Sequence, residues 1–573
     1  METAAAPPRV VAVSPTPHST NSERTAEIVI TFDTPLDPAS VNTSTVSVFG
    51  KWSGVMAGSL RLESNNTRVR FIPTRFPAAG DWMWASLARG IRSATGDSLA
   101  KGYAWNYWVK TQRATLNLVE VGRVAVRRQG ESRIQTYGAH GADLNNDGFS
   151  DFFVPNEISN DCRVFLNNGS GFYSSFTVYP IPNGARPSTN ESADFNRDGN
   201  MDIAVGNSTG DSVTVFLGNG NGGFLSIRNY QTSGGIRGLS VGDFDGDGDA
   251  DIVTANRSGN NVAVLLNNGD GTFAQRSTIE ANGNGETACA MADANNDGIL
   301  DVFVGAYNSS EIILLLGNGT GGFTYATKVA AGGNGPWMIA VGDMNADGNV
   351  DVVTANSGSN NCAVIFGNGA GGLSAAATYP TGGFPIAIDV GDIDGDGDLD
   401  LVTSNYSGRN WSVYENNGSG VLVNRRTLAS SSAGSCATLH DRDNDGDMDM
   451  TGIDENDDLI FLFENRPATS VEERPLPRRF ALHPNVPNPF NPQTTILYDV
   501  AEAAEISISI VNISGQHIRT MAREFVPAGS YVANWDGTSD EGRAVASGIY
   551  LCRMQVTTAH RSFVLARKLV LMR

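Results

Sequence analysis

Between residues 113 and 467, short apolar runs recur with turn-forming residues between them. One stretch carries in succession MIAVGD (338–343), VDVVTAN (350–356) and NCAVIFGNG (361–369), followed by a Gly-rich hairpin. Alternation with a period of two and β-branched runs of this length predict strands rather than helices. A unit of about 50 residues is therefore predicted to hold four short strands.

A nine-residue acidic loop separates the first two predicted strands of each unit. Its seven copies begin 49 to 51 residues apart, at Asp143, Asp194, Asp243, Asp293, Asp343, Asp392 and Asp441. Four-stranded units at a constant period favour a β-propeller, because radial stacking leaves few exposed strand edges. Seven copies predict seven blades.

The last unit lacks the hairpin signal that the other six carry. After DDLIFLFENRPA (457–468), Pro467 interrupts the strand pattern, so a fourth strand is missing there. In the alignment of the units, that strand corresponds to GRVAVRRQ (122–129). We predict that this segment completes the seventh blade and closes the ring.

The loop has the composition of a site for a hard cation. Calcium prefers six to eight oxygen ligands, and side chains at loop positions 1, 3, 5 and 9 can surround one ion. Besides the seven position-1 residues above, these are Asn145, Asn196, Asp245, Asn295, Asn345, Asp394 and Asp443 at position 3, Asp147, Asp198, Asp247, Asp297, Asp347, Asp396 and Asp445 at position 5, and Asp151, Asp202, Asp251, Asp301, Asp351, Asp400 and Asp449 at position 9.

Position 7 varies too much to supply a common side chain, so a backbone carbonyl is predicted to bind there: Phe149, Asn200, Asp249, Ile299, Asn349, Asp398 and Asp447. The loop has no Glu at position 12 and no flanking helix pattern, which argues against an EF-hand. Magnesium retains its waters and suits the loop less well. Asp, Asn and Gly also make ordinary turns, but seven identical spacings favour about seven calcium ions.

These units resemble the integrin-like FG-GAP or VCBS repeat over about residues 113–467. The resemblance rests on the Asp-x-Asp-x-Asp-Gly-x-x-Asp loops and on FLGNGNGGF (216–224) and LLLGNGTGGF (314–323). It implies a calcium-binding propeller, a fold that serves adhesion receptors, lectins and polysaccharide-active enzymes alike.

Residues 1–112 are predicted to form a separate β-sandwich. The runs AEIVITFDTPLDPASV, STVSVFG and RVRFIPT, with GIRSATGDSLAKGYAWNYWVKT, resemble a bacterial Ig-like domain of the Big_5 type. Its cluster of Trp82, Trp84, Trp105 and Trp108 is interpreted as sandwich core rather than a sugar-stacking platform.

A second small sandwich is predicted at 483–573, after a linker at 468–482. The segments VNISGQHIRT, AGSYVANWDGTSDEGRAVASGIYLCRM and RKLVLMR resemble the C-terminal sorting domain of the type IX secretion system and the FlgD-like Ig fold. The first resemblance implies bacterial export by a C-terminal signal, to the outer cell surface or the medium. The predicted fold class is all-β: a seven-bladed propeller flanked by two Ig-like sandwiches.

Charge and composition exclude several classes of function. A formal charge of −21, with 27 of the 61 acidic residues inside the seven loops, argues against nucleic acid as a partner. No apolar run is long enough for a membrane span, and METAAAPPRV does not resemble a secretory signal. The five cysteines have no CxxC spacing and are interpreted as buried apolar residues.

Loops at the end of the units opposite the calcium loops differ between copies, so any specificity is expected there. Their Arg and aromatic side chains could stack on sugars or pair with carboxylates: Arg186, Arg237, Arg257, Tyr307, Trp337, Phe384, Tyr406 and Arg409. An ordinary hydrated loop surface is the alternative.

The third residue before each acidic loop is predicted to face the channel; we call these residues the channel ring: His140, Glu191, Ser240, Ala290, Ala340, Asp389 and Thr438. An acid near a His could transfer protons, but a water-filled channel also accommodates both, and no nucleophile, phosphate-loop or zinc-protease motif is present. We expect a non-enzymatic adhesion or binding protein for a glycan or cell-surface protein. A self-associating filament subunit and a polysaccharide-active enzyme are the alternatives.

Overall fold

The computed structural model describes residues 7–466, 479–483, 485, 488–501, 504–526, 529–558 and 561–572. The described residues contain strands and two short 3-10 helices, η1 (Pro38–Ser40) and η2 (Pro182–Gly184), and no α-helix. The chain divides into two compact units, Met1–Pro467 and Ala468–Arg573. The predicted all-β class is confirmed, while most of the predicted 468–482 linker lies outside the described residues.

The N-terminal segment forms two four-stranded sheets. One has the order β1 (Val10–Ser14), β2 (Ile28–Phe32), β6 (Arg68–Pro73) and β5 (Gly58–Glu63); the other has the order β4 (Gly54–Val55), β3 (Val46–Gly50), β7 (Trp82–Leu87) and β8 (Tyr103–Trp108). Alternate residues of β2, such as Ile28 and Ile30, are buried in the core, which is the pattern of a sheet with one face packed inward.

The repeats form seven four-stranded antiparallel sheets within the fully described range 118–465. Six consist of consecutive strands: β10 (His140–Ala142), β11 (Asp151–Asn156), β12 (Asp161–Asn167) and β13 (Tyr173–Pro180); β14 (Pro187–Ala193), β15 (Asp202–Asn207), β16 (Ser212–Gly218) and β17 (Phe224–Gln231); β18 (Ile236–Gly242), β19 (Asp251–Asn256), β20 (Asn261–Asn267) and β21 (Phe273–Ile279); β22 (Glu286–Ala292), β23 (Asp301–Ala306), β24 (Glu311–Gly317) and β25 (Phe323–Ala330); β26 (Pro336–Gly342), β27 (Asp351–Asn356), β28 (Asn361–Ile365) and β29 (Ala377–Pro380); and β30 (Pro385–Gly391), β31 (Asp400–Asn405), β32 (Asn410–Asn416) and β33 (Leu422–Ala429).

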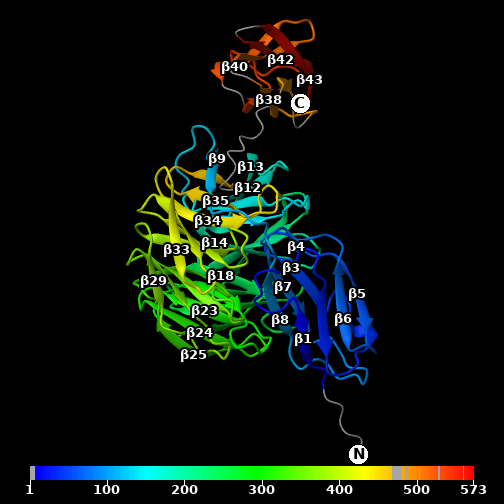
Figure 1. Cartoon of the computed structure of the whole chain (residues 1–573), viewed down its shortest axis with the longest axis vertical. Helices are drawn as coiled ribbons and strands as arrows, with labels where there is room; N and C mark the ends of the chain where they lie inside the picture. Colours follow the sequence, from blue (N-terminus) through cyan, green and yellow to red (C-terminus); the bar gives the residue numbers. More distant parts are fainter. Residues whose placement is uncertain are drawn as a thin grey trace, which may run out of the picture. The chain divides into compact units, whose positions relative to one another are not determined.

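The seventh sheet borrows its fourth strand from the start of the repeat region. Its order is β34 (Gly434–His440), β35 (Asp449–Asp454), β36 (Leu459–Asn465) and β9 (Leu118–Ala125). The predicted segment 122–129 does supply the added strand, but the strand begins four residues earlier and ends at Ala125, with Leu459 opposite Ala125 and Asn465 opposite Leu118. The arrangement of these sheets fits a propeller (Figure 1).

The second strand of every sheet is buried along its whole length, from Asp151–Asn156 to Asp449–Asp454. A strand buried on both faces reads as a continuous apolar run, which explains sequences such as DVVTAN. These strands pack sheet against sheet. Phe153 of the first sheet, for example, shares a core with Ile203 and Val205 of the second.

Asn side chains join neighbouring sheets. The Asn267 amide donates to the carbonyl of Phe195 at 2.7 Å, and the Asn465 amide donates to that of Ile393 at 2.6 Å. The Asn167 amide of the first sheet donates to the Arg442 carbonyl of the seventh at 2.9 Å. The first and last repeats are thus hydrogen-bonded neighbours.

The C-terminal unit, considered by itself, has two sheets in its described residues. Their orders are β37 (Ala481–Leu482), β38 (Thr494–Val500) and β41 (Gly529–Trp535), and β40 (His517–Val526), β39 (Ala504–Asn512), β42 (Gly548–Thr557) and β43 (Ser562–Leu571). Ile506, Tyr498 and Trp535 lie in one core between them. All five cysteines are free, and four of them are buried.

Candidate functional site

Six of the seven acidic loops share one hydrogen-bonded conformation. In the first, the Asp143 carboxylate accepts the N–H groups of Asp147 and Gly148, both at 3.0 Å. The position-1 carboxylates of loops two to six accept the same two N–H groups. The position-6 glycine takes a positive φ, 88° at Gly148, which glycine adopts with little strain.

Position 9 connects the loop to the third strand. Both oxygens of Asp151 accept backbone N–H groups, from Leu144 at 3.0 Å and from Asn167 at 2.7 Å. Burial raises the pKa of this carboxyl to about 8, although those two bonds favour its charged form. Asp202 and Asp351 behave alike, each with a pKa of about 8 because of burial.

The donors fit a hard cation. Carboxylate oxygens of Asp243, Asp245 and Asp251 can approach within 4.8 Å of one another, as can those of Asp392, Asp394 and Asp400, and of Asp441, Asp443 and Asp445. Both buried oxygens of Asp441 lack a hydrogen-bond partner among the described residues. Carboxylates this close repel one another unless a positive charge lies between them.

The seventh loop contains a cation of its own. Arg442 at position 2 is almost fully buried, and its guanidinium lies 3.3 Å from the position-9 carboxylate of Asp449. It also donates to the carbonyl of Gly171 in the first repeat. None of the other six loops has a basic residue at this position.

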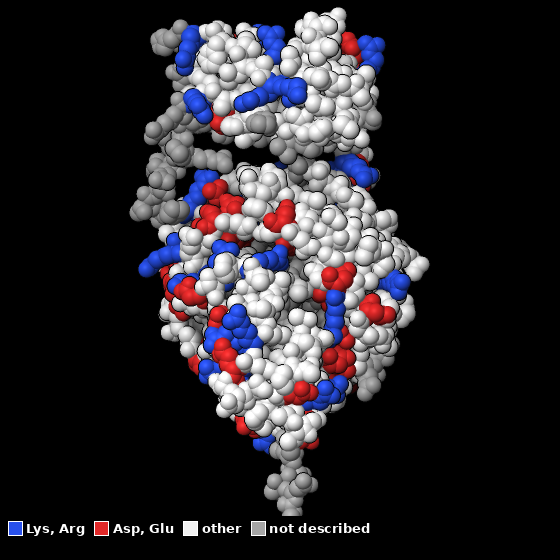
Figure 2. All heavy atoms as spheres, turned by 90° about the vertical axis from the view of Figure 1, so that its right-hand side faces the viewer, with Lys and Arg blue, Asp and Glu red and all other residues white. Residues whose placement is uncertain are grey.

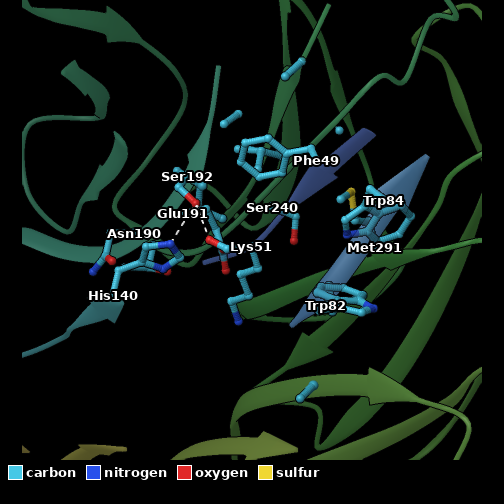
Figure 3. Close-up of a pocket in the computed structure, with 18 of the residues that line it drawn as sticks. Phe49, Lys51, Trp82, Trp84, His140, Asn190, Glu191, Ser192, Ser240 and Met291 are labelled. Carbon is cyan, nitrogen blue, oxygen red and sulfur yellow. Dashed lines mark hydrogen bonds between the residues drawn. The ribbon is translucent and has the colours of Figure 1, made fainter. Parts of the chain in front are cut away.

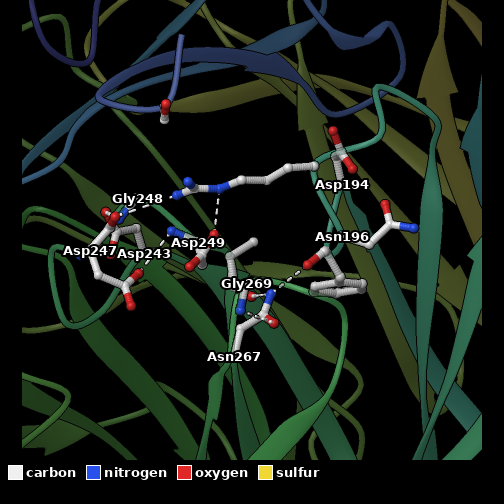
Figure 4. A network of polar contacts seen from close by, with 12 residues as sticks. Asp194, Asn196, Asp243, Asp247, Gly248, Asp249, Asn267 and Gly269 are labelled. Atoms are coloured by element: carbon white, nitrogen blue, oxygen red, sulfur yellow. Dashed lines mark hydrogen bonds and ion pairs between the residues drawn. The ribbon is translucent and has the colours of Figure 1, made fainter. Parts of the chain in front are cut away.

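Position 4 links several loops to their neighbours. Asn146 donates to Asn200 at 3.0 Å, and Asn296 donates to Asn349 at 2.9 Å. Arg197 of the second loop is ion-paired with Asp249 of the third, the junction drawn in Figure 4. Position 4 also has a positive φ, 57° at Ala346, which the sequence pattern did not predict.

The N-terminal sandwich docks on the end of the repeats that carries the acidic loops, which we call the metal-loop face. Backbone N–H groups of Arg89, Ala104 and Ala114 donate to Gly246, Gly298 and Asp394, each at 2.8 Å. The Thr111 hydroxyl donates to Asp392 at 3.0 Å, and Arg75 is 3.2 Å from Asp143. Side chains of both charge signs are interspersed on the side of the molecule drawn in Figure 2.

Small residues at position 4 make room for the sandwich. A Cβ on Gly246 would lie 2.6 Å from the Gly102 nitrogen, and one on Gly395 would lie 2.1 Å from the Gln112 oxygen. The turn at Lys51 is held by buried Asp81, which accepts the N–H groups of Trp52 and Ser53 at 3.1 and 3.0 Å.

All seven channel-ring residues line one cavity of about 560 Å³, as the sequence predicted. The sandwich supplies the rest of the lining at one end, including Lys51, Trp82, Trp84 and Trp108 (Figure 3). The interpretation of the tryptophans as sandwich core is right for Trp105. It is wrong for the other three, because their strand face packs against the repeats.

One side of the cavity carries the titratable groups. His140 Nε2 is 2.8 Å from the Ser192 hydroxyl, which donates to the Lys51 carbonyl at 3.2 Å. Burial, reinforced by the positive charge of Lys51, lowers the pKa of His140 to about 3, so its imidazole is neutral. Burial raises the pKa of Glu191 and of Asp389, and Lys51 opposes both rises.

Six of the eight predicted ligand-face residues gather at the other end of the channel. Arg257 lies 4.4 Å over the Tyr307 ring and 5.0 Å over Trp337, while Phe384 contacts Trp337 and Tyr406. Arg237 lies over Trp337 at 6.0 Å. Arg186 and Arg409 are both exposed, and neither lies over an aromatic ring of the described residues.

Sequence reasoning missed Tyr137, whose hydroxyl accepts a 2.9 Å hydrogen bond from the Trp337 indole. A signal existed, because Tyr137, Arg237 and Trp337 are each the sixth residue before an acidic loop. We call Tyr137, Arg237, Arg257, Tyr307, Trp337, Phe384 and Tyr406 the aromatic end.

Comparison with known proteins agrees with this architecture. A model of the FG-GAP-like repeat matches residues 143–205, 194–254, 243–304, 293–354, 343–403 and 394–451. The bacterial Ig-like domain model matches 4–109, and the FlgD Ig-like domain model matches 492–560. No curated protein matches the chain.

Similar solved structures include an Agrocybe aegerita lectin that recognises non-reducing terminal N-acetylglucosamine, with 20% identity, 70% of this chain and 94% of that chain covered, and a TM-score of 0.36. A Lactobacillus plantarum protein has 15% identity, 68% and 98% coverage, and a TM-score of 0.42. A periplasmic gluconolactonase of Pseudomonas aeruginosa has 15% identity, 60% and 97% coverage, and a TM-score of 0.35.

Similarities this distant carry no information about a ligand. The repeat matches together span 143–451, more than half of the 573 residues. The chain belongs to the FG-GAP-like repeat family.

Proposed function

We propose that this protein is an extracellular binding module, built as a closed seven-bladed propeller, that engages a glycan or a cell-surface partner through its aromatic end. The observation that carries the proposal is the cluster of half-buried Tyr307, Trp337, Phe384 and Tyr406 rings beside Arg237 and Arg257. Aromatic faces stack on sugar rings, and guanidinium groups pair with carboxylates.

The position of the cluster supports this role. Strands β18 and β26 carry Arg237 and Trp337 near their starts and end just before acidic loops, so the aromatic end and the loops lie at opposite ends of these strands. The N-terminal sandwich occupies part of the metal-loop face, through backbone contacts such as those with Gly246, Gly298 and Asp394, and the aromatic end lies away from these contacts. Within the part of the chain that the structure describes, no helix has the length and hydropathy of a membrane span.

Calcium is proposed as the structural cation, about one ion per loop. Positions 1, 3, 5 and 9 supply the side-chain oxygens and position 7 a carbonyl, a donor set that suits calcium. The seventh site is expected to be the weakest, because the buried guanidinium of Arg442 already neutralises Asp449. Ring closure is supported by the contacts between first and last repeats, including Asn444 to the Gly148 carbonyl at 2.8 Å.

A glycan array tests the proposal with full-length protein in calcium. Trp337→Ala is expected to weaken binding at least about tenfold, because it removes the ring that Arg257, Tyr307 and Phe384 contact. Tyr325→Ala is the matched control, since Tyr325 is a 40% exposed aromatic residue on the outer strand β25. Equal binding by both variants, or a glycan-negative array together with failure to bind cell surfaces, would contradict the proposal.

A filament or surface-layer subunit is the second candidate. Strand β43, ten residues long, forms an edge of its sheet and pairs with β42. Asn488 and Phe490 hydrogen-bond its end at Lys568 and Val570, and the earlier part of the edge can accept a strand from another chain. Both candidate functions include the proposal that the C-terminal unit directs export of the protein. Concentration-dependent polymers in electron microscopy would favour the filament.

A further inference from the structure

The cavity between the N-terminal sandwich and the repeats has two chemically different walls. One wall carries the Trp82, Trp84 and Trp108 rings with Met291 and Met338; the other carries Lys51, His140, Glu191 and Asp389. In Figure 3, Trp82 and Trp84 lie on one side and His140 and Glu191 on the other, with Lys51 between them. At about 560 Å³ the space is in the range of small-molecule sites.

The indole wall offers both a stacking surface and hydrogen-bond donors. Trp82 and Trp108 are stacked, with ring centroids 5.7 Å apart and planes at 20°. The Nε1–H groups of both are buried and have no hydrogen-bond partner among the described residues. Trp108 is only 4% exposed, so solvent does not supply the missing partner of its Nε1–H group. Buried unpaired donors of this kind call for an acceptor.

The polar wall supplies donors and acceptors together. The ammonium of Lys51 enters from the turn after β3, and no ion pair joins it to Glu191 or Asp389 within 4.0 Å in the described structure. Because the Ser192 hydroxyl gives its one proton to the Lys51 carbonyl, His140 donates from Nε2 and keeps Nδ1 as an acceptor. Such a wall suits a ligand with several hydroxyl groups.

The cavity reaches the surface beside the second and third acidic loops. Its lining includes exposed Thr43, Ser44 and Ser47 of the sandwich and Arg197 and Gly199 of the second loop. At the far end, Tyr137 of its lining is bonded to Trp337. The exposed lining residues give a small molecule a route into the cavity on the sandwich side, away from the aromatic end.

We propose that this cavity binds a saccharide of one or two rings, as a site distinct from the aromatic end. A pyranose has an apolar C–H face, which stacks on an indole, and a rim of hydroxyl groups, which match the mixed donors and acceptors of the opposite wall. Apart from Asp194, Arg197 and Asp243 of the acidic loops, the Asp, Glu, Lys and Arg side chains that line the cavity are Lys51, Glu191 and Asp389, one basic and two acidic. The net negative charge selects an amino sugar over a uronic acid.

Tryptophan fluorescence and calorimetric titration of the full chain in calcium test the site, with glucosamine, glucose, glucuronate and their β-1,4-linked disaccharides as probes. We expect affinity to fall in the order amino sugar, neutral sugar, uronic acid. Ala340→Phe, which extends a ring from the channel ring into the cavity, is expected to weaken binding at least about tenfold. Double replacement Glu191→Gln and Asp389→Asn is expected to remove or reverse the preference for the amino sugar.

Trp337→Ala is the control, because it alters the aromatic end and leaves the channel ring intact. Retained saccharide binding by this variant would show that the cavity and the aromatic end are separate sites. Failure of one proposal can then be distinguished from failure of the other. Unchanged melting temperatures must accompany the cavity variants; if Ala340→Phe does not fold, Ala290→Leu takes its place. No binding of any probe up to about 10 mM, or binding that none of the cavity variants alters, would show a channel that holds water only.

Discussion

The metal-loop face and the aromatic end are the two ends of the same set of strands, yet their residues vary to different degrees from repeat to repeat. At the metal-loop face, seven loops repeat the same Asp and Gly positions, and the N-terminal sandwich docks on several of them. At the aromatic end the equivalent positions differ, as with Tyr137, Arg237 and Trp337. Repetition therefore marks what holds the fold together, and divergence marks where a partner can be distinguished.

The largest expected effect is at Gly395, in loop position 4, where a side chain larger than hydrogen would block docking of the sandwich. Gly395→Asn places an Asn that loops one, four and seven carry at this position, but its Cβ would meet the Gln112 oxygen at 2.1 Å. We expect a loss of about 3 kcal/mol in the free energy of unfolding, measured by denaturant titration. Ala346→Asn, at an exposed position 4, should change stability by less than about 0.5 kcal/mol. Equal effects would contradict the docking.

A smaller loss of stability is expected from substitutions that remove the hydrogen bonds between neighbouring repeats. Asn267→Ala removes the amide that donates to the carbonyls of Phe195 at 2.7 Å and Ala250 at 3.0 Å. Both carbonyls lose a buried partner, so we expect a loss of about 2 kcal/mol. Asn268→Ala, at the neighbouring exposed residue, is the control. A loss equal to that of Asn267→Ala would mean that the inter-sheet bond contributes little.

The smallest effect concerns pH at the aromatic end. Burial, with Glu157 nearby, raises the pKa of Glu455 from 4.5 to about 7. The folded state then holds this proton more tightly than the unfolded state, so stability falls as pH rises from about 4.5 to 7. Glu455→Gln should flatten that part of the pH profile. A shift of this size corresponds to about 3 kcal/mol at pH 7, but the variant also loses the charge that faces Arg133, so we expect a net gain of about 1 kcal/mol. A variant with the slope of the parent protein would contradict the assignment.

Much of the repeat region could be predicted because each unit repeats the same order of strands and loops. The channel ring from His140 to Thr438 followed from alternation alone, and the borrowed strand β9 followed from a missing hairpin. Docking of the sandwich could not be predicted in this way, because the residues that form the contact do not recur at a fixed spacing. It depends on surface shape, through Gly246 and Gly395, and on the strand face that turns Trp82, Trp84 and Trp108 outward.

Lys51 and Arg442 escaped prediction for a related reason. Each is a single cation whose partners come from distant parts of the chain, Lys51 facing Glu191 and Asp389, and Arg442 facing Gly171 of the first repeat. Nothing local distinguishes them from solvated basic residues. Tyr137 was different, since its place in the repeat would have identified it.

Calcium binding by the seven loops is the central claim, and metal removal tests it most directly. Thermal unfolding of the full chain should be followed with calcium and after chelation, alongside a count of bound metal. Each site filled at 100 times its Kd contributes about 2.7 kcal/mol, so the account predicts close to seven ions and a large fall in melting temperature on chelation. An unchanged melting temperature and no bound metal would mean that these loops are turns held by their own hydrogen bonds.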